Sequence, residues 1–358
     1  MTTPVDLATI HTIDRVLAMA QEVVEPGPYT WAAAGAGEGF TVRRNRVALD
    51  HLALVPELMQ DVSSVDPSTT VLGVPIAFPV LISPVGSTVL FHPDSAVAVA
   101  AGATLAGTSS FCATFTRARW EDAAATAPGR HFFQLYVGGD RGWLGAVTDR
   151  IQEAGFAALC VTVDSAVVSR RDALFASGFD WRVEREGIPE NLVRHGRDDL
   201  FKRRFTWSDF EWLCEHARVP VGVKGILTAR DAVRAVERGA AAVYVSNHGG
   251  RAVDHEVSTI EVLAEIIDAV GDRAEVLVDG GFQRGADVCK ALALGAQAVA
   301  IGRLQCWGLA LGGAAGVARV LSILHDEVTS TMALLGARNV AELTRDHVRW
   351  SHGVARPL

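Results

Sequence analysis

Short runs of apolar, largely β-branched residues alternate with longer Ala-rich amphipathic segments from about residue 72 onward. The short runs predict strands at 80–83, 108–113, 132–136, 158–164, 219–224, 241–246, 275–279 and 298–301. The longer segments predict helices at 94–106, 142–154, 228–238, 259–270, 285–294 and 309–329. Eight strands with helices between them are typical of a parallel (β/α)8 TIM barrel, although two stacked Rossmann units would give the same alternation.

Two segments fall outside this alternation. Residues 1–71 precede the first strand and are expected to form an N-terminal helical segment that packs on the outside of the barrel or covers its bottom. The longest irregular stretch, 172–207, follows the fourth strand and is expected to form a lid over the C-terminal mouth. The glycine-rich run 35–39 lacks a preceding strand and predicts a helix terminus. No Gly/Ser-rich or Pro-rich linker divides the chain, so 1–358 is predicted to be a single domain.

Composition narrows the partners and the compartment. The net charge is −8, and the only basic cluster, Lys202-Arg203-Arg204, is most simply a solvated run, so no nucleic-acid or membrane partner is expected. The five cysteines are scattered and no metal-ligand spacing occurs, which indicates a reducing compartment and no metal site. The first 25 residues contain no signal-like apolar run and no transmembrane helix is expected, so the sequence predicts a cytoplasmic protein.

Titratable residues recur where the predicted strands end, which is where the active site of a barrel lies. They are Asp164, Lys224, His248 with Arg251, Asp279 and Arg303. Any one of them alone could be structural, because a lone His is more often a packed or solvated residue and a strand-end Asp often caps the next helix. A base, a lysine and arginines at separate strand ends favour a shared site.

The segment 246–251, Ser-Asn-His-Gly-Gly-Arg, is the most informative of these strand ends. The glycines permit a tight turn that leaves the imidazole of His248 open to a ligand. Arg251 offers a planar fork that suits a carboxylate. A base beside a carboxylate clamp is what proton abstraction next to a carboxylate requires.

The glycines that follow the last two strands predict a phosphate site. They lie in Asp279-Gly280-Gly281 and Gly302-Arg303. Loops after strands seven and eight commonly hold phosphate in barrels through main-chain N–H groups. The alternative is two ordinary glycine turns with a surface arginine.

These motifs resemble one family of flavoenzymes. SNHGGR at 246–251, VKGI at 223–226, DGG at 279–281, IGR at 301–303, FFQLY at 132–136 and TVD…RR at 162–171 are similar in order and spacing to the FMN-dependent α-hydroxy acid oxidases and dehydrogenases. That family includes glycolate and lactate oxidases, mandelate dehydrogenase and lactate monooxygenase. The similarity extends from about residue 31 to about residue 336 and implies a TIM barrel.

The resemblance implies a catalytic group around His248. His248 would take the proton of the substrate hydroxyl while hydride passes to flavin N5, or the α-proton in a carbanion route. Asp164 would orient His248 and stabilise its cationic form, and Tyr136 would hydrogen-bond the reacting oxygen. Arg251 and Arg171 would hold the substrate carboxylate.

The resemblance also implies an FMN site. Lys224 would lie near flavin N1/O2, where a fixed positive charge stabilises the anionic reduced ring. The isoalloxazine would be lined by Pro84, Val85 and Gly86 and hydrogen-bonded by Gln134, Thr162 and Ser246. The ribityl phosphate would be held by Asp279, Gly281, Gly302 and Arg303.

The chain departs from the family pattern at several of these positions. Trp31 stands where a carboxylate-binding tyrosine is usual, and Phe115 and Ala113 replace a tryptophan and a serine, which would widen the pocket; compensated packing drift is the alternative. Gln283 stands where a phosphate-binding arginine is usual, so Arg284 or Arg303 alone would carry the charge. Gly86 replaces the alanine common in fast oxidases, which leaves the electron acceptor open.

The sequence therefore predicts an FMN-dependent oxidase of a bulky or aryl (S)-2-hydroxy acid, with O2 as acceptor and a homotetrameric assembly implied by the resemblance. One alternative is a decarboxylating monooxygenase, or an oxidase of a tailored metabolite, on the same fold. A second alternative is a non-catalytic flavin-binding barrel, which the presence of His248, Asp164, Lys224 and Arg251 disfavours.

Overall fold

Eight parallel strands form the centre of the protein, and the computed structural model describes residues 5–180 and 200–351 of the chain. The strands are hydrogen-bonded in the order β4-β11-β10-β9-β8-β7-β6-β5. They are β4 (Val80–Ile82), β5 (Phe111–Ala113), β6 (Phe132–Leu135), β7 (Ala158–Thr162), β8 (Val221–Ile226), β9 (Ala242–Val245), β10 (Glu275–Val278) and β11 (Ala298–Ile301). A bridge between Ile82 and Ser110 joins the two edge strands, so the sheet closes and the predicted (β/α)8 barrel is confirmed over two Rossmann units.

Alternate residues of each strand face opposite sides of the barrel wall, as the strand period requires. Leu81, Phe111, Phe132, Tyr244 and Leu277 fill the interior. The intervening apolar side chains pack outward against the helices. Both faces are therefore buried, which is why these strands are almost continuously apolar in sequence.

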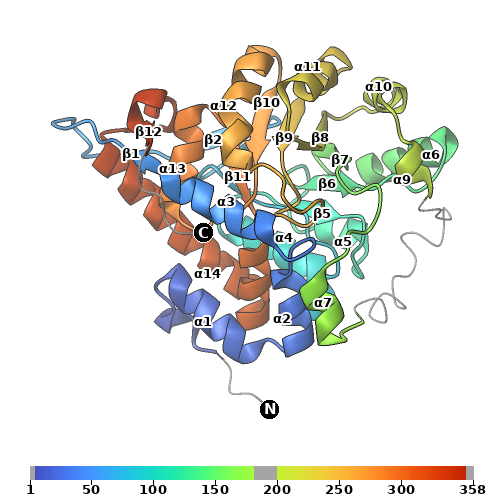
Figure 1. The fold of residues 1–358 in the computed structure, drawn as a ribbon, viewed down its shortest axis with the longest axis horizontal. Coiled ribbons are helices and arrows are strands. Elements are labelled where there is room, and N and C mark those ends of the chain that lie inside the picture. Colours follow the sequence, from blue (N-terminus) through green and yellow to red (C-terminus); the bar gives the residue numbers. More distant parts are fainter. Residues whose placement is uncertain (1–4, 181–199, 352–358) are drawn as a thin grey trace.

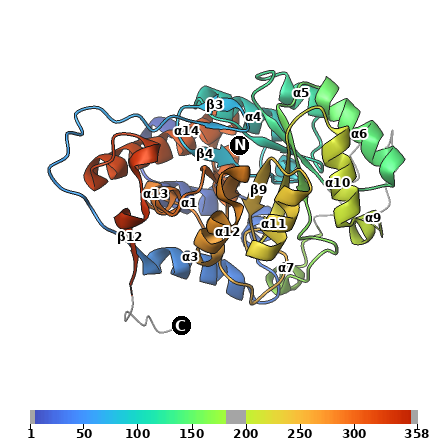
Figure 2. The ribbon, with the colours of Figure 1, turned by 90° about the horizontal axis from the view of Figure 1, so that it is seen from above.

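Helices follow the strands and surround them (Figures 1 and 2). They are α4 (Ser95–Leu105), α5 (Trp120–Ala124), α6 (Arg141–Glu153), α10 (Trp207–His216), α11 (Ala229–Glu237), α12 (Thr259–Val270), α13 (Gly285–Leu294) and α14 (Arg303–Leu335). Thr228 Oγ1 accepts from the Asp231 N–H and caps α11, and Glu261 accepts from the Ser258 N–H at the start of α12. Short 3-10 turns occur at Leu7–Thr9, Thr88–Leu90, Gly271–Arg273, Val340–Glu342 and Arg345–His347.

Helix α14 differs from its prediction. It starts six residues before the expected 309–329 segment, and Gly312 and Gly313 are non-helical, so it is two helices joined at a kink. By length and apolar composition alone it would be long enough to cross a membrane, but most of its apolar stretch is buried in the protein. It packs against α4 and α1, as a core helix does.

The N-terminal segment forms helices that lie on the outside of the barrel and at its mouth, which is the first of the two expected placements. They are α1 (Ile13–Val23), α2 (Pro26–Ala33) and α3 (Phe40–His51). In Figure 1, α1 and α2 lie beside α14, and α3 packs on α12. The run 35–39 separates α2 from α3, which confirms it as a helix terminus.

The bottom of the barrel is closed by a β-hairpin that the sequence analysis did not predict. Its strands are β2 (Thr69–Val71) and β3 (Val74–Ile76), joined by Leu72 and Gly73 in the left-handed region. The hairpin packs its apolar side chains against the barrel interior, and Leu72 donates its N–H to the carboxylate of Glu275 at 2.9 Å. A second small sheet pairs β1 (Leu52–Leu54) with β12 (Val348–Trp350).

The predicted lid 172–207 is described only in part. Residues 172–177 form α7 (Asp172–Ser177), and α9 (Leu200–Arg204) lies near its other end, so these parts are helical rather than irregular. The remainder, 181–199, lies outside the described residues.

The strand predicted at 108–113 begins at Phe111, because residues 108–110 close the barrel through side-chain and single main-chain bonds to β4.

Candidate active site

The turn that follows β9 carries His248 in an unusual main-chain conformation. His248, Gly249 and Gly250 have φ values of 57°, 64° and 75°, so three consecutive residues are left-handed. For a non-glycine residue this conformation costs about 1 kcal/mol or more, which places His248 among the strained residues that favour functional sites. Gly250 is required by space as well, because a Cβ there would lie 2.6 Å from the main-chain nitrogen of Val42 in α3.

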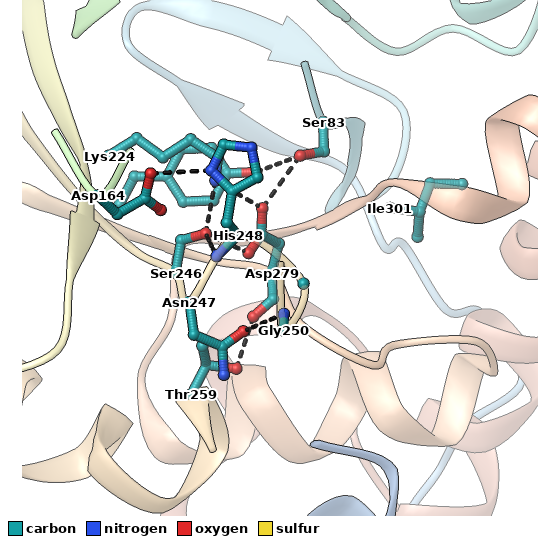
Figure 3. A network of polar contacts seen from close by, with 12 residues as sticks. Ser83, Asp164, Lys224, Ser246, Asn247, His248, Gly250, Thr259, Asp279 and Ile301 are labelled. Atoms are coloured by element: carbon teal, nitrogen blue, oxygen red, sulfur yellow. Dashed lines mark hydrogen bonds and ion pairs between the residues drawn. The ribbon is translucent and has the colours of Figure 1, made fainter. Parts of the chain in front are cut away.

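His248 is held between the phenol of Tyr136 and the carboxylate of Asp164, the second of which Figure 3 shows. Its Nδ1 lies 2.8 Å from Asp164 Oδ1, and its Nε2 lies 3.3 Å from the hydroxyl of Tyr136. A carboxylate only accepts hydrogen bonds, so Nδ1 carries the proton in the neutral ring and Nε2 presents a lone pair. Burial would raise the pKa of Asp164, but His248 and Lys224 outweigh it and lower that pKa, so Asp164 remains an anion.

A bulge in β8 allows Asp164 to reach this position. The register of β8 against β9 shifts between Lys224 and Ile226, and Gly225 lies in the left-handed half of φ space at 111°. A Cβ on Gly225 would lie 2.6 Å from the Cβ of Asp164. Glycine is therefore needed there for the close approach of the two strand ends.

Lys224 is a fully buried cation, and it lies inside β8 rather than at its end as predicted. Its Nζ lies 3.2 Å from Asp279 Oδ2 and donates to Ser246 Oγ, which in turn donates to the other carboxylate oxygen of Asp279 (Figure 3). Burial would lower the pKa of Lys224, but the carboxylates of Asp279 and Asp164 outweigh it and raise the pKa. The ammonium is therefore fixed and charged.

Aromatic side chains form one wall of the site. Phe115 and Tyr136 stack with ring centroids 5.2 Å apart, and burial raises the pKa of Tyr136 to about 12, with a further contribution from Asp164. The ammonium of Lys202 in α9 lies 4.3 Å from the Tyr136 ring and 5.0 Å from the Phe115 ring. Lys202 is thus part of this wall, which corrects the prediction that 202–204 is simply a solvated run.

Two arginines join the barrel to helix α2. Arg251 Nη1 donates to the carbonyls of Trp31, Ala32 and Ala34, and its guanidinium lies 5.1 Å from the Trp31 ring. Arg303 Nε donates to the same Ala32 carbonyl. Both guanidiniums are therefore oriented by the last turn of α2, where its free carbonyls lie.

Excess positive charge is buried near these arginines. Burial, followed by repulsion from Arg171 and Arg303, lowers the pKa of Arg251 well below its usual value. Burial also lowers the pKa of Arg303 to about 10. Within the described part of the chain, Arg171 Nε and Arg303 Nη2 are buried without a hydrogen-bond partner. Anions placed among these groups would reduce both the repulsion and the desolvation cost.

A single cavity collects nearly all of the residues that the sequence analysis selected. Asp164 and Ser246 are not among its lining residues and act from behind His248 and Lys224. The predicted residues that line it are Trp31, Pro84, Val85, Gly86, Phe115, Gln134, Tyr136, Thr162, Arg171, Lys224, His248, Arg251, Asp279, Gly281, Gln283, Gly302 and Arg303.

The polar groups of this cavity fit FMN. Gln134 Nε2, Thr162 Oγ1 and Arg303 Nη2 are buried without hydrogen-bond partners among the described residues, as expected of groups that bond a ligand. At Gly302 a Cβ would meet no atom within 4 Å, and α14 begins at the next residue, so main-chain N–H groups and Arg303 border open space. This end fits a phosphate, and the Lys224 end fits the flavin ring.

The positive charge at this end of the cavity comes from Arg303 and not from Arg284. The Arg284 guanidinium forms ion pairs with Glu327 at 2.9 Å and Asp14 at 3.4 Å on the outside of the barrel. Gln283 lines the cavity and its main-chain N–H donates to Asp287. The departure at Gln283 therefore removes a cation that no neighbour replaces.

Some residues of the site carried no recognisable sequence signal. Ser83 accepts a hydrogen bond from Tyr244 and donates one to Asp279, and Cys306 and Trp307 line the cavity from the first turn of α14. Trp307 lies four residues after Arg303 in the sequence, and this proximity was the one feature that could have indicated its place in the site. Among residues 5–180 and 200–351, no group of three His, Cys, Asp or Glu side chains is arranged to hold a metal.

A closed barrel with a carboxylate-bound histidine, a buried lysine and excess buried positive charge near the last strands is the arrangement expected of a flavin-dependent oxidoreductase of the TIM-barrel class. The profile of the FMN-dependent dehydrogenase family matches residues 20–350. The chain belongs to this family, its cofactor is FMN, and it acts on CH–OH groups, as predicted.

Individual relatives agree with this assignment. L-lactate oxidase of Nostoc sp. is 38% identical over 333 residues, which cover 88% of this chain and 91% of that protein. Glycolate oxidase 3 of Arabidopsis thaliana is 38% identical, with 92% and 94% covered. A crystal structure of mandelate oxidase with benzoyl-formic acid superimposes with a TM-score of 0.88 at 35% identity and covers 97% of this chain and 100% of that one.

Proposed function

We propose that the enzyme oxidises an (S)-2-hydroxy acid with a bulky or aryl substituent to the 2-oxo acid, with His248 as base and O2 as electron acceptor. The observation that carries the proposal is the lone pair of His248 Nε2 beside Tyr136, with Asp164 bonded to the opposite ring nitrogen. This arrangement suits a base that becomes cationic during the reaction, because the Asp164 anion stabilises the imidazolium.

The chain's own residues bind and orient the substrate. The substrate carboxylate is placed by Arg251 and Arg171, whose buried charges lack a carboxylate partner within the described residues. The hydroxyl then lies between Tyr136 and His248. Its proton moves to His248 Nε2 as the Cα–H bond breaks, and the electron pair of that bond leaves as hydride. FMN, when bound, would supply the hydride acceptor and would pass the electrons to O2 to give hydrogen peroxide.

Loss of the α-hydrogen as hydride requires less energy than its removal by His248 as a proton. A C–H bond beside a carboxylate is a far weaker acid than imidazolium, so a histidine that abstracts it works against a large difference in acidity. Transfer of the hydroxyl proton to His248 Nε2 does not have to overcome such a large difference in acidity. The proposed role of Lys224 follows, because its fixed charge stabilises negative charge that arrives at the flavin ring.

The preference for a bulky substituent rests on the aromatic wall. Phe115, Tyr136 and Trp31 present ring faces and edges to the cavity, and such surfaces pack well against an aryl group. Solved relatives include mandelate oxidase with (S)-mandelic acid, which is a 2-hydroxy acid with a phenyl substituent.

The test is anaerobic mixing of the FMN-loaded enzyme with a panel of 2-hydroxy acids while the flavin absorption is followed. We expect the fastest bleaching with (S)-mandelate, slower bleaching with lactate and glycolate, and a 2-oxo acid plus hydrogen peroxide once air is admitted. A product shortened by one carbon, with CO2, would identify a decarboxylating monooxygenase instead. Absence of bleaching by every acid would reject the proposal.

All five cysteines lie in the described residues and are free, and four of them are buried. This supports the further proposal that the enzyme works in a reducing compartment, the cytoplasm.

A further inference from the structure

The base in the proposed function lies on a turn beyond the last ladder hydrogen bond of its strand. Strand β9 ends at Val245, so the ladder hydrogen bonds of the sheet stop before His248. The next residues are left-handed, a conformation that persists only where the surroundings enforce it. The His248 N–H donates to Ser246 Oγ and Arg303 donates to the Gly249 carbonyl. Further contacts come from the side chain of Asn247 and from helix α3.

Asn247 and Asn45 form a reciprocal amide pair. Asn45 Nδ2 donates to Asn247 Oδ1 at 2.9 Å, and Asn247 Nδ2 donates to Asn45 Oδ1 at 2.8 Å. The two side chains are 1% and 0% exposed, so water does not compete for these bonds. Asn45 lies in α3, 202 residues before its partner and outside the barrel wall.

The Asn247 amide also bonds the chain at two points beyond His248, of which Figure 3 shows the bond to Gly250. Its Oδ1 accepts from the N–H of Gly250 at 3.0 Å, and its Nδ2 donates to the carbonyl of Val257 at 3.1 Å. With the two bonds to Asn45, both donors and both acceptor positions of the amide are used. Loss of Asn45 would leave half of this buried amide unpaired, and the turn would shift to pair it again.

Helix α3 also lies against the loop that is expected to hold the cofactor. A Cβ on Gly281 would lie 2.9 Å from the Cβ of Asn45, and Arg46 donates to the Gly281 carbonyl while it pairs with Asp287. Asn45 is therefore placed between the His248 turn and the 279–281 loop. Its contacts can hold the His248 turn at a fixed position relative to the 279–281 loop.

We propose that Asn45 is a positioning residue for the reaction, which holds His248 at the correct place through the side chain of Asn247. The proposal rests on the proposed role of His248 as base. Asn45 itself touches neither the cavity nor His248 and acts only through the turn. Small displacements of a base matter because a shift of about 1 Å can lower a rate about 100-fold.

The test compares Asn45→Ala with a control at the preceding residue of the same helix, Arg44. Arg44→Ala removes a half-exposed ion pair with Glu261 and leaves the amide pair intact. We expect Asn45→Ala to lower the limiting rate of anaerobic flavin reduction by about 10- to 100-fold, while KM for the best hydroxy acid and the Kd for FMN each change less than about threefold. Arg44→Ala should stay within about twofold on all three.

A second variant covers the case in which Asn45→Ala does not fold. Asn45→Ser leaves an uncharged hydroxyl that can donate or accept in the same buried site. We expect a smaller loss of the limiting rate, with the FMN spectrum retained. A wild-type limiting rate in a folded Asn45→Ala or Asn45→Ser protein, or a loss explained wholly by weaker FMN binding, would overturn the proposal.

Combination with His248→Gln separates positioning from a general structural effect. If Asn45 acts through His248, adding Asn45→Ala to His248→Gln lowers flavin reduction by no more than about twofold further. A full further loss in the double variant would overturn the proposal, because it would mean that Asn45 acts elsewhere. Undiminished flavin reduction in His248→Gln alone would instead reject the proposed function.

Discussion

The two ends of the barrel are made from the same strands and differ in everything that surrounds them. At the bottom, Phe111, Phe132 and Leu277 pack against the β2–β3 hairpin in an apolar cluster. At the mouth lie Lys224 in β8, Asp279 after β10 and the His248 turn after β9, which are hydrogen-bonded and charged, and the first two are buried. Stability is therefore concentrated at one end and chemistry at the other, as is typical of this fold.

Tyr244 marks the boundary between the two ends. Its ring lies 5.7 Å from that of Phe111, and its hydroxyl donates to Ser83, which bonds Asp279. The Lys224 ammonium lies 4.9 Å from the Tyr244 ring. One side chain thus belongs to both regions, and substitutions on its two sides should separate rate from stability.

The largest expected effect is at the mouth. His248→Gln removes the base, so flavin reduction by the best hydroxy acid should fall by about 100- to 10,000-fold. The yellow FMN spectrum and the thermal unfolding midpoint should remain close to those of the wild type. Anaerobic stopped-flow absorbance measures this, and bleaching at the normal rate would remove His248 from the mechanism.

The matching change at the bottom is Phe132→Ala. Phe132 is fully buried in the barrel interior, so its truncation should lower the free energy of unfolding by about 3–5 kcal/mol. Denaturant unfolding measures this loss. The limiting rate of flavin reduction in the folded variant should be unchanged, and a large fall in that rate would show that the two ends are coupled.

Low pH should also lower the stability of the fold through a histidine at the bottom of the barrel. His131, which precedes β6, is buried, and Ser110 N–H donates to its Nδ1. Burial, then repulsion from Arg130, lowers its pKa to about 4. Because the folded-state pKa lies below the unfolded value, the stabilisation is complete above about pH 6.5 and is lost as pH falls toward 4.

From these values His131 should contribute about 2 kcal/mol to the loss of stability between about pH 7.5 and pH 5. Urea unfolding of the wild type and of His131→Gln at the two pH values gives the difference. Equal pH dependence in both proteins would contradict the assignment to His131.

A smaller effect is expected within the mouth, at the phosphate end. Gln283→Arg restores a cation that Arg284 does not supply, because Arg284 is paired with Glu327. FMN should bind about tenfold more tightly, within the range for a hydrogen bond to a charged group. Fluorescence titration of apoprotein with FMN measures this, with Arg284→Gln as a control that should leave the Kd nearly unchanged. A Kd for Gln283→Arg no tighter than the wild-type value would place residue 283 away from the phosphate.

The smallest predicted effect concerns Trp31. If this residue lies near the substrate carboxylate, Trp31→Tyr should improve turnover of lactate about threefold, a difference of under 1 kcal/mol. Steady-state peroxide production measures it. No gain would place residue 31 away from the carboxylate.

The sequence was sufficient for the barrel and for most of the mouth, because strand-end motifs are local and keep their order. It did not predict the Lys202 contact with Phe115 and Tyr136, or the Asn45–Asn247 pair, since neither has a local pattern that links residues so distant in sequence. The hairpin at the bottom was also missed, because two three-residue strands with a Leu-Gly turn are too short to stand out from a loop. Lys224 was placed at a strand end because the bulge at Gly225 is not visible in a run of apolar residues.

The three carbonyls that Arg251 contacts all belong to the end of helix α2 or the residue after it. A piece of chain with no strand in the barrel therefore forms part of the wall of the cavity. Such a piece is exchangeable in principle: grafting residues 26–34 from a relative would change the shape of the binding pocket while the eight strands and their chemistry stayed as they are. The substrate range of this fold can therefore change without substitution of the residues at the strand ends.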